Sequence, residues 1–352
     1  MITASYEILR DSYDEAVKVD DLIDGAQSRI YNAIQSSVKT DIQEIGSVLN
    51  EAMKVVEKNQ KASGGLSGVP SGFQSLDRVT RGWQASDLII LAARPSVGKT
   101  AFALNLARNA AVDYHMPVAV FSLEMSALQL VMRLMTTESG LSADKLKGGA
   151  KLDPWDWQQL ETRLANLSKA PLYIDDTPSI PLMEFRTKIK RLVKAKDVRL
   201  VIVDYLQLMQ GPAELRGMRE QEVAAISRTL KATAKELNVP IIALSQLSRD
   251  AVKRTGGSGK PQLSDLRESG SIEQDADMVI FIHRPDYVGL GETPDGKETT
   301  QVIIAKHRNG EVCDIDMLFK AEQVRFVEPG DTLVARAEEM GGTESAMNSA
   351  MN

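Results

Sequence analysis

Residues 88–111, LIILAARPSVGKTAFALNLARNAA, place a glycine-containing loop between an apolar run and a helical pattern. The apolar run predicts a buried strand, and the spacing of apolar side chains over 100–112 predicts a helix. A loop that leaves a strand and opens a helix offers its backbone N–H groups to phosphate. ARPSVGKT at 93–100 therefore predicts a P-loop, in which Lys99 reaches the β- and γ-phosphates and Thr100 holds Mg²⁺.

The first position of this loop is Ala93, where the general motif has glycine. Alanine is the mildest replacement and fits if its φ stays negative. The alternative is a chance Gly-Lys-Thr at a helix start, which the flanking strand and helix disfavour. The predicted nucleotide-binding segment comprises Ala93, Arg94, Pro95, Ser96, Val97, Gly98, Lys99, Thr100 and Ala101.

Strands and helices keep alternating beyond the loop. Apolar runs precede helical patterns or a loop at 118–123, 172–174, 199–204 and 239–244. Nearly continuous apolar strands between helices are typical of a parallel sheet covered on both faces. Short polar links join the later runs, which predicts an antiparallel extension over 278–282, 301–306, 315–319 and 324–327. The expected fold class is α/β with a mostly parallel central sheet.

The two ends of the chain differ from this middle part. Residues 1–61 have helical periodicity, and their apolar stripes need a partner surface, either the body of this chain or a neighbouring subunit. Gly and Ser at 62–68 predict a flexible joint. The Gly-, Ser-, Met- and Glu-rich end predicts disorder. The expected division is a helical linker region at 1–65, a nucleotide-binding domain at 66–330 and a disordered tail at 331–352.

The composition excludes several classes of protein. The 352 residues are 43% hydrophobic and carry a net charge of −6, so any polyanion must bind to a local basic surface. The single cysteine, Cys313, excludes a disulfide framework and a Cys-based zinc site within one chain. Apolar runs fall short of the roughly 18 residues that span a bilayer. The polar start resembles no targeting peptide, so the expectation is a cytoplasmic protein without membrane contact.

Three polar side chains end predicted strands at the edge that faces a ligand in α/β sheets. Asp204 ends the strand 200–204 and is expected to orient Mg²⁺ through water, as a Walker B carboxylate does. Glu124 either polarises the attacking water or caps the helix near Ser126, and the sequence favours neither. Gln246 is expected to sense the γ-phosphate and to relay its loss to the following loop.

That loop, residues 247–267, is basic in an acidic chain. It holds five basic residues against two acidic ones, with Gly, Ser and Thr between them and no aromatic side chain. This pattern favours contact with a nucleic-acid backbone rather than base stacking, and a solvated loop is the alternative. The loop 211–220 is a weaker candidate. The basic residues singled out are Arg249, Lys253, Arg254 and Arg267 in the first loop and Arg216 and Arg219 in the second.

A further basic pair closes a late strand, in AKHRNG at 305–310. Lys306 and Arg308 share one face of the strand by alternation. Such a pair can act in trans on the γ-phosphate bound to a neighbouring subunit, as an arginine finger does. Solvated charges in a hairpin are the alternative.

Six motifs in this order resemble the DnaB-type replicative DNA helicases, over about residues 20–327. They are the segment 88–111, FSLEMS at 121–126, IVDYLQLM at 202–209, EVAAISRTLKATAKELNVPIIALSQLSR at 222–249, DLRESGSIEQDAD at 265–277 and IAKHRNG at 304–310. The resemblance implies a RecA-like motor domain behind a helical linker. It also implies a homo-hexameric ring that hydrolyses ATP with Mg²⁺ and moves 5′ to 3′ on single-stranded DNA.

The resemblance also implies roles for individual residues. Glu124 becomes the catalytic glutamate, Gln246 the sensor, and Lys306 and Arg308 the trans-acting pair. Backbone groups of Arg267, Glu268 and Gly270 help to hold the DNA phosphates. The segment near 20–36 matches the helix that packs on the adjacent subunit.

The chain departs from the family at its start, because most of the amino-terminal collar domain is missing. This leaves the primase contact doubtful and can weaken ring closure, while a helicase loader stays a possible partner. Two other functions are therefore weighed. One is a truncated form that binds and hydrolyses ATP without unwinding DNA, and the other is a RecA-like recombinase.

Overall fold

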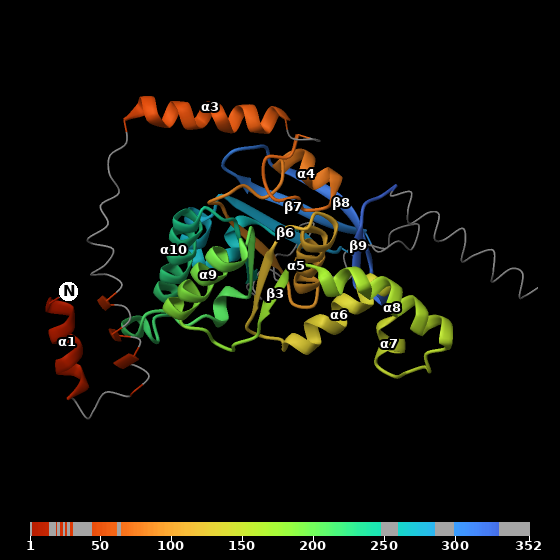
Figure 1. Ribbon diagram of the computed structural model, residues 1–352, viewed down its shortest axis with the longest axis horizontal. Coiled ribbons are helices and arrows are strands. Elements are labelled where there is room, and N and C mark those ends of the chain that lie inside the picture. The colour runs from red at the N-terminus through yellow and green to blue at the C-terminus, as the bar shows by residue number, and fades with distance from the viewer. Residues whose placement is uncertain are drawn as a thin grey trace, which may run out of the picture.

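The computed structural model describes residues 2–13, 19, 22–23, 25–26, 29–30, 44–61, 65–247, 260–285 and 299–330. Its centre is a nine-stranded sheet with the order β3-β2-β4-β5-β1-β6-β7-β8-β9. Helices cover both faces of this sheet (Figure 1). The strands are β1 (Leu88–Ala93), β2 (Val118–Ser122), β3 (Leu172–Asp175), β4 (Leu200–Asp204), β5 (Ile241–Gln246), β6 (Met278–His283), β7 (Thr299–His307), β8 (Cys313–Lys320) and β9 (Arg325–Val327).

The helices fill the connections between these strands. The α-helices are α1 (Ile2–Ser12), α3 (Ile45–Lys61), α4 (Gln74–Thr80), α5 (Lys99–Arg108), α6 (Ala127–Ser139), α7 (Ala143–Leu146), α8 (Pro154–Lys169), α9 (Leu182–Lys196), α10 (Arg219–Leu237) and α11 (Gly270–Asp275). A π-turn, η2 (Asn109–Asp113), extends α5. The short 3₁₀ turns are η3 (Leu206–Leu208), η4 (Ala213–Leu215), η6 (Leu263–Ser269) and η8 (Ala321–Gln323).

The pairing of β6 corrects one expectation. The sequence pattern assigns 278–282 to the antiparallel extension, but β6 runs parallel to β1, with Ile89 opposite Met278 and Ala93 opposite Ile282. Among the described strands, β7, β8 and β9 form the antiparallel part. The connection into β6 contains η6 and α11, and a helical crossover of this kind returns the chain to a parallel position. The expectation was wrong because the short polar links that indicate antiparallel pairing occur only after β6.

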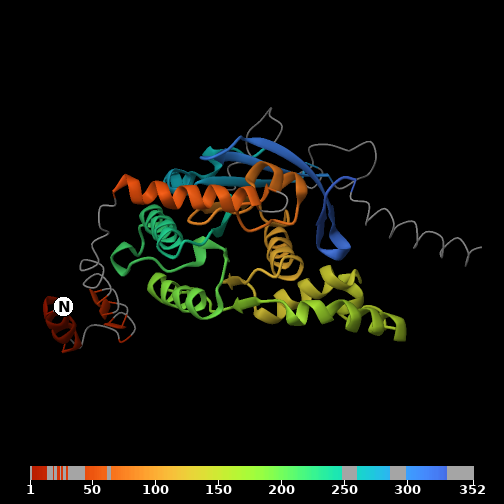
Figure 2. The same ribbon diagram turned by 45° about the horizontal axis from the view of Figure 1, so that its top comes forward.

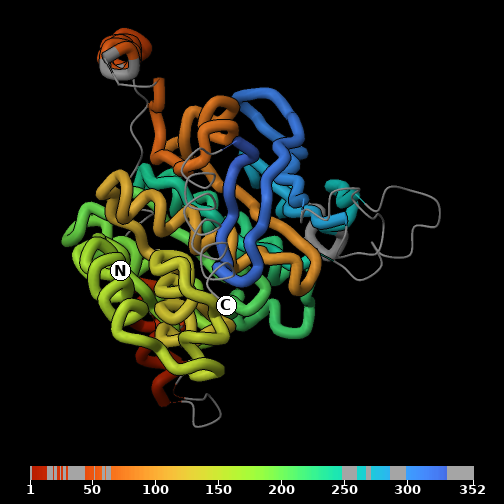
Figure 3. Tube along the Cα trace, turned by 90° about the vertical axis from the view of Figure 1, so that its right-hand side faces the viewer, coloured from red at the N-terminus to blue at the C-terminus, as the bar shows by residue number. Residues whose placement is uncertain are grey.

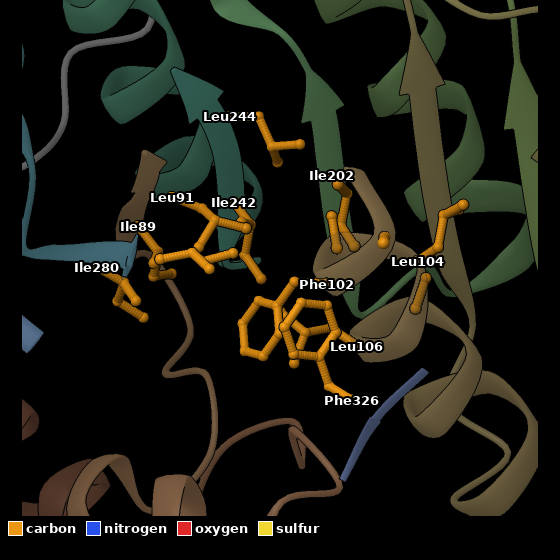
Figure 4. Close-up of a cluster of buried hydrophobic side chains, with 14 of the residues drawn as sticks. Ile89, Leu91, Phe102, Leu104, Leu106, Ile202, Ile242, Leu244, Ile280 and Phe326 are labelled. Carbon is orange, nitrogen blue, oxygen red and sulfur yellow. The ribbon is translucent and has the colours of Figure 1, made fainter. Parts of the chain in front are cut away.

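Two hydrophobic layers hold the sheet, as the unbroken apolar runs predict. Alternate residues of β1 point to opposite faces, Ile89 and Leu91 to one and Leu88 and Ile90 to the other. The first face packs on α5 and on Phe326 of β9 (Figure 4). The second face packs on α9, α10 and α11. The buried strands therefore fix the edge at which their polar carboxyl-terminal residues gather.

The amino-terminal helices do not belong to either layer. Arg29 pairs with Glu7 and Asp11 of α1 at 3.4 and 2.6 Å. Helix α3 lies outside the body, as Figures 1 and 3 show, and crosses in front of it in the view of Figure 2. Its apolar side chains stay in water, with Ile45 83% and Leu49 59% exposed. The predicted unpartnered stripe is thus present in α3, whereas most of 20–36 and all of the tail at 331–352 lie outside the described residues.

Helices α4, α8 and α11 were not expected from the sequence. They begin at Gln74, Pro154 and Gly270. The start of α8 has a capping box between Asp153 and Asp156 with Pro154 behind it, a signal that the apolar periodicity did not reveal. Helices α6 and α8 lie side by side (Figure 1).

Candidate nucleotide-binding site

The P-loop connects β1 to α5 as the sequence predicts. Ala93 completes β1 and takes no positive φ, so alanine replaces glycine without strain. The loop turns instead at Ser96 and Gly98, whose φ angles are 64° and 112°. A Cβ on Gly98 would lie 3.3 Å from the Phe326 ring, which stacks edge-on against Phe102 at 5.0 Å. The phosphate-binding loop therefore packs at Gly98 against the Phe326 ring, and Figure 4 shows that ring beside Phe102.

Asp204 meets the first residues of α5. The hydroxyl of Thr100 donates to Asp204 Oδ2 at 2.6 Å. The Nζ of Lys99 lies 3.8 Å from Asp204 Oδ1. That oxygen is buried and has no hydrogen-bond partner in the described part of the chain. A buried carboxylate oxygen without a partner is costly unless a ligand or solvent completes it, so this geometry suits a cation with bound water.

Tyr205 was not expected at this site. The Nζ of Lys99 lies 4.4 Å from the centroid of the Tyr205 ring. Burial lowers the pKa of Lys99, and the Asp204 and Glu124 carboxylates counteract that effect. Burial also raises the pKa of Tyr205, with help from Glu124 and Asp204. The ring thus contacts the P-loop ammonium next to the Walker B candidate, and its position one residue after Asp204 was the available signal.

Glu124 follows β2, whose last residue, Ser122, lies opposite Asp204. The helix behind it is capped by Ser126, which forms a capping box with Gln129. Because Ser126 fills the cap position, the capping alternative for Glu124 is wrong. Its exposed carboxylate instead lines the same cavity as Lys99 and Thr100.

This cavity encloses about 800 Å³, within the range of small-molecule sites. Gln246, which lies opposite Ala93 at the end of β5, also lines it. The sequence did not predict the outer wall, which α6, α7 and the β8–β9 hairpin supply. Its residues include Met132, Arg133, Lys147, Phe319 and Val324. These side chains follow the ordinary pattern of amphipathic helices and strands, so the sequence gives no signal that they line a binding site.

Lys306 and Arg308 lie at the opposite edge of the sheet. His307 at the end of β7 pairs with Met278 at the start of β6. The six residues of β1 separate this edge from the P-loop, a span of roughly 20 Å at 3.3 Å per residue. The pair therefore cannot reach the cavity of its own chain. Lys306 in β7 and Arg308, one residue beyond its end, both donate to the end of α11, Lys306 to Glu273 O and Arg308 to Gln274 O, each at 2.5 Å.

The carboxylate of Asp277 organises this second edge. It accepts the Leu88 backbone N–H at 2.8 Å and binds Lys231. Arg308 lies 3.6 Å from its other oxygen. Burial and this neighbouring carboxylate raise the pKa of Asp87 to about 6.

The candidate DNA-contacting residues are only partly described. Arg249, Lys253 and Arg254 lie outside the described residues, and for Arg267, Glu268 and Gly270 the structure gives the backbone of η6 and α11 alone. Arg216 is exposed beside η4. Arg219 is committed within the chain, since it donates to Gln207 O at 2.5 Å and pairs with Glu222 at 3.1 Å.

Two other kinds of feature are absent from the described ranges. None of their helices is long and apolar enough to cross a membrane. They also hold no group of three or more His, Cys, Asp or Glu side chains arranged for a metal ion.

Comparisons with known proteins agree with this geometry. The family model of the DnaB-like helicase C terminal domain matches residues 68–328. The replicative DNA helicase DnaB of Geobacillus stearothermophilus is 45% identical over 327 residues, which cover 93% of this chain and 71% of that protein. The replicative DNA helicase DnaC of Bacillus subtilis (strain 168) is 44% identical over the same shares.

Solved structures give the same result for the fold. One solved ATPase domain superposes with a TM-score of 0.74 at 37% identity, covering 82% of this chain and all of that one. A DnaB-like replicative helicase, whose structure was described together with its interactions with primase, gives 0.73 at 34% identity over 93% of this chain and 75% of that one. The expected fold class is therefore confirmed, and the chain belongs to the DnaB-like helicases.

Proposed function

We propose that this chain is the motor of an ATP-dependent replicative DNA helicase. It moves 5′ to 3′ on single-stranded DNA as a ring and unwinds duplex DNA in the cytoplasmic replisome of a bacterium, phage or mobile element. The observation that carries this is the convergence of Lys99, Glu124 and Gln246 on one cavity, with Asp204 in contact with Lys99 and Thr100 beside it. Membership of the DnaB-like family supports the nucleic-acid substrate.

ATP and Mg²⁺ are the proposed ligands of the cavity. The backbone of 93–101 wraps the phosphates, and Lys99 lies where it can neutralise β- and γ-phosphate charge. Thr100 and the Asp204 oxygen that lacks a hydrogen bond fit Mg²⁺, held partly through water. The bound ion would neutralise developing charge on the phosphate oxygens. With two such groups from the protein, the remaining ligands come from phosphate and water.

Glu124 and Gln246 have separate tasks in this proposal. The Glu124 carboxylate lines the cavity and is free of the helix cap, so it can orient and deprotonate the attacking water. Gln246 presents a neutral amide from the end of β5 and reports whether the γ-phosphate is present. Both act from strand ends that the buried core fixes in place.

The active assembly is proposed to be a homo-hexamer. Lys306 and Arg308 lie at the edge opposite the P-loop, so a neighbour that docks head to tail brings them to the cavity of the next chain. Helix α3 carries an exposed apolar stripe that includes Ile45, Leu49 and Met53, and we assign this stripe to the adjacent subunit. This proposal adds 45–61 to the packing segment near 20–36 that the resemblance implies.

DNA contact is assigned to the two basic loops and to the backbone of 267–270. Arg216 and Arg219 are the side-chain candidates of the shorter loop, and Arg219 also donates to Gln207 O and Glu222. The helical region 1–65, the domain 66–330 and the tail 331–352 are proposed as the units of the chain. A helicase loader is a proposed partner of this chain.

Family membership disfavours the recombinase alternative. The truncated ATPase is separated from the helicase by measuring hydrolysis against protein concentration, with and without single-stranded DNA, alongside mass by light scattering. A sixfold mass with steeply concentration-dependent, DNA-stimulated hydrolysis and unwinding of a forked duplex is the expected result. A monomer without hydrolysis would contradict the ring motor.

A further inference from the structure

The side chain of Gln207 is hydrogen-bonded to both backbone polar groups of Gln246, the last residue of β5. Gln207 lies in η3, just after β4. Its Nε2 donates to Ser245 Oγ at 2.9 Å and to Gln246 O at 3.4 Å. Its Oε1 accepts the Gln246 N–H at 3.4 Å. One neutral amide thus holds both backbone polar groups of the proposed γ-phosphate sensor, and it does so by donating and accepting at the same time.

The backbone of Gln207 holds a different segment. Arg219 at the start of α10 donates from Nη2 to Gln207 O and from Nη1 to Glu222. Glu222 in turn accepts the Gly211 N–H at 3.2 Å. A Cβ on Gly211 would lie 2.5 Å from Glu222 Cγ, so this close approach needs glycine. Both ends of the segment 211–218 therefore contact the Arg219–Glu222 pair, through the Gly211 N–H and the Met218 carbonyl. Arg219 in turn is hydrogen-bonded to the backbone of Gln207.

The ion pair between Arg219 and Glu222 is suited to a segment that changes position rather than to one that is held rigidly. The side chains of Arg219 and Glu222 are 43% and 16% exposed. Because the Arg219 end of this pair is open to solvent, screening limits what the pair contributes to stability. Its contacts can therefore follow a shift of Gln207 without a large cost, and the segment moves with them.

We propose that Gln207 is a positioning residue that transmits the state of the nucleotide site to the segment 211–218. The inference rests on the proposed function, because it takes Gln246 as the sensor and 211–218 as a DNA loop. When Gln246 engages or releases the γ-phosphate, its backbone moves, the Gln207 amide follows, and Arg219 shifts the base of the segment. This route is separate from the basic loop that directly follows β5.

Hydrogen exchange of residues 211–218 tests the relay without relying on DNA. The intact chain is measured with Mg²⁺ and either ADP or a non-hydrolysable ATP analogue. The expected nucleotide-dependent difference in exchange rate is at least about fivefold in the unmodified protein, the lower end of common allosteric couplings. Gln207→Met, which keeps the volume but removes the amide, should reduce it to less than about twofold.

Two variants make this comparison decisive. Gln210→Met is the matched control, since the Gln210 side chain is exposed and has no hydrogen-bond partner in the described ranges; it should keep the fivefold difference. Gln207→Glu retains the acceptor and loses the donor, so it should give a reduced difference even if Gln207→Met does not fold. An unchanged difference in the Gln207 variants, or none in the unmodified protein, would overturn the relay.

Hydrolysis with and without single-stranded DNA separates this outcome from the proposed function. If DNA stimulates the unmodified protein, the ratio of stimulated to basal rate should fall toward one in Gln207→Met and persist in Gln210→Met. If DNA fails to stimulate the unmodified protein, the helicase proposal is contradicted, while the exchange experiment still decides whether Gln207 couples the two segments.

Discussion

The two edges of the parallel strands carry similar charged residues in different states. At the carboxyl-terminal edge, Asp204 keeps a buried oxygen without a hydrogen-bond partner in the described part of the chain, next to Lys99 and Thr100, which line an open cavity. At the amino-terminal edge, Asp277 is satisfied by the Leu88 N–H, Lys231 and Arg308. An incompletely satisfied edge is suited to a ligand, whereas a satisfied one supports the fold until a stronger anion competes for its cations.

This difference gives Arg308 two alternative partners. In the isolated chain it holds the end of α11 through Gln274 O and lies near Asp277. In the proposed ring it turns toward the phosphate of a neighbour. The four changes below test whether the two edges differ in this way, in order of decreasing effect.

The largest effect is expected for Lys99→Ala at the open edge. Removing the ammonium leaves phosphate charge without its partner, so hydrolysis should fall at least about 10³-fold. Steady-state phosphate release measures this loss. Lys169→Ala, an exposed residue at the end of α8, is the control and should leave the rate unchanged. A Lys99→Ala protein that hydrolyses ATP normally would remove the P-loop from the mechanism.

Arg308→Ala should lower the rate of ATP hydrolysis by about 10² to 10³-fold, measured at a protein concentration at which the ring is assembled, while nucleotide binding persists. Titration with a fluorescent ADP analogue measures binding separately from turnover. The matched control is Lys231→Ala, which removes the other cation from Asp277 and lies outside the proposed finger. Equal losses in both variants would make Arg308 a structural residue only.

Tyr205→Leu should raise KM for ATP by about 3- to 30-fold, as expected for the loss of a partly buried cation–π contact. Tyr205→Phe keeps the ring over Lys99 and should stay within about twofold of the unmodified protein. Initial rates over a range of ATP concentrations give KM and kcat for each variant. If Phe and Leu are equally impaired, the hydroxyl and not the ring face is the functional part.

The smallest effect concerns Asp87 at the satisfied edge. Its pKa of about 6 lies above the unfolded value of about 3.9, so the folded state binds more protons between these limits. Ionisation of Asp87 therefore costs stability as the pH rises through about 6. Asp87→Asn should raise the free energy of unfolding by about 1 kcal/mol at pH 8, after allowance for partial exposure, and by clearly less at pH 5.

Urea denaturation at the two pH values measures this difference. Glu161→Gln, which removes an exposed carboxylate on α8, makes the same change in net charge. It should alter stability little at either pH. If Asp87→Asn raises the free energy of unfolding equally at both pH values, the gain does not come from the titration of this carboxyl.

Sequence reasoning found what local patterns encode. The apolar runs predicted the strands, and α10 begins and ends where expected, at 219 and 237. Strand ends placed Asp204, Glu124 and Gln246 at one edge because parallel strands align their carboxyl ends. The parallel pairing of β6 was missed, since pairing partners are chosen by the whole fold. The Tyr205 and Gln207 contacts were missed for the same reason, because they depend on side-chain direction across neighbouring strands.

The most direct test of the two-edge account is a mixture of two inactive proteins. Lys99→Ala keeps an intact Arg308, and Arg308→Ala keeps an intact P-loop. If a neighbour completes each site, mixed rings place an intact Arg308 beside an intact P-loop, and hydrolysis should rise well above the sum of the two separate rates. Mixed assemblies of confirmed sixfold mass that stay at that sum would contradict completion of the site by a neighbouring subunit.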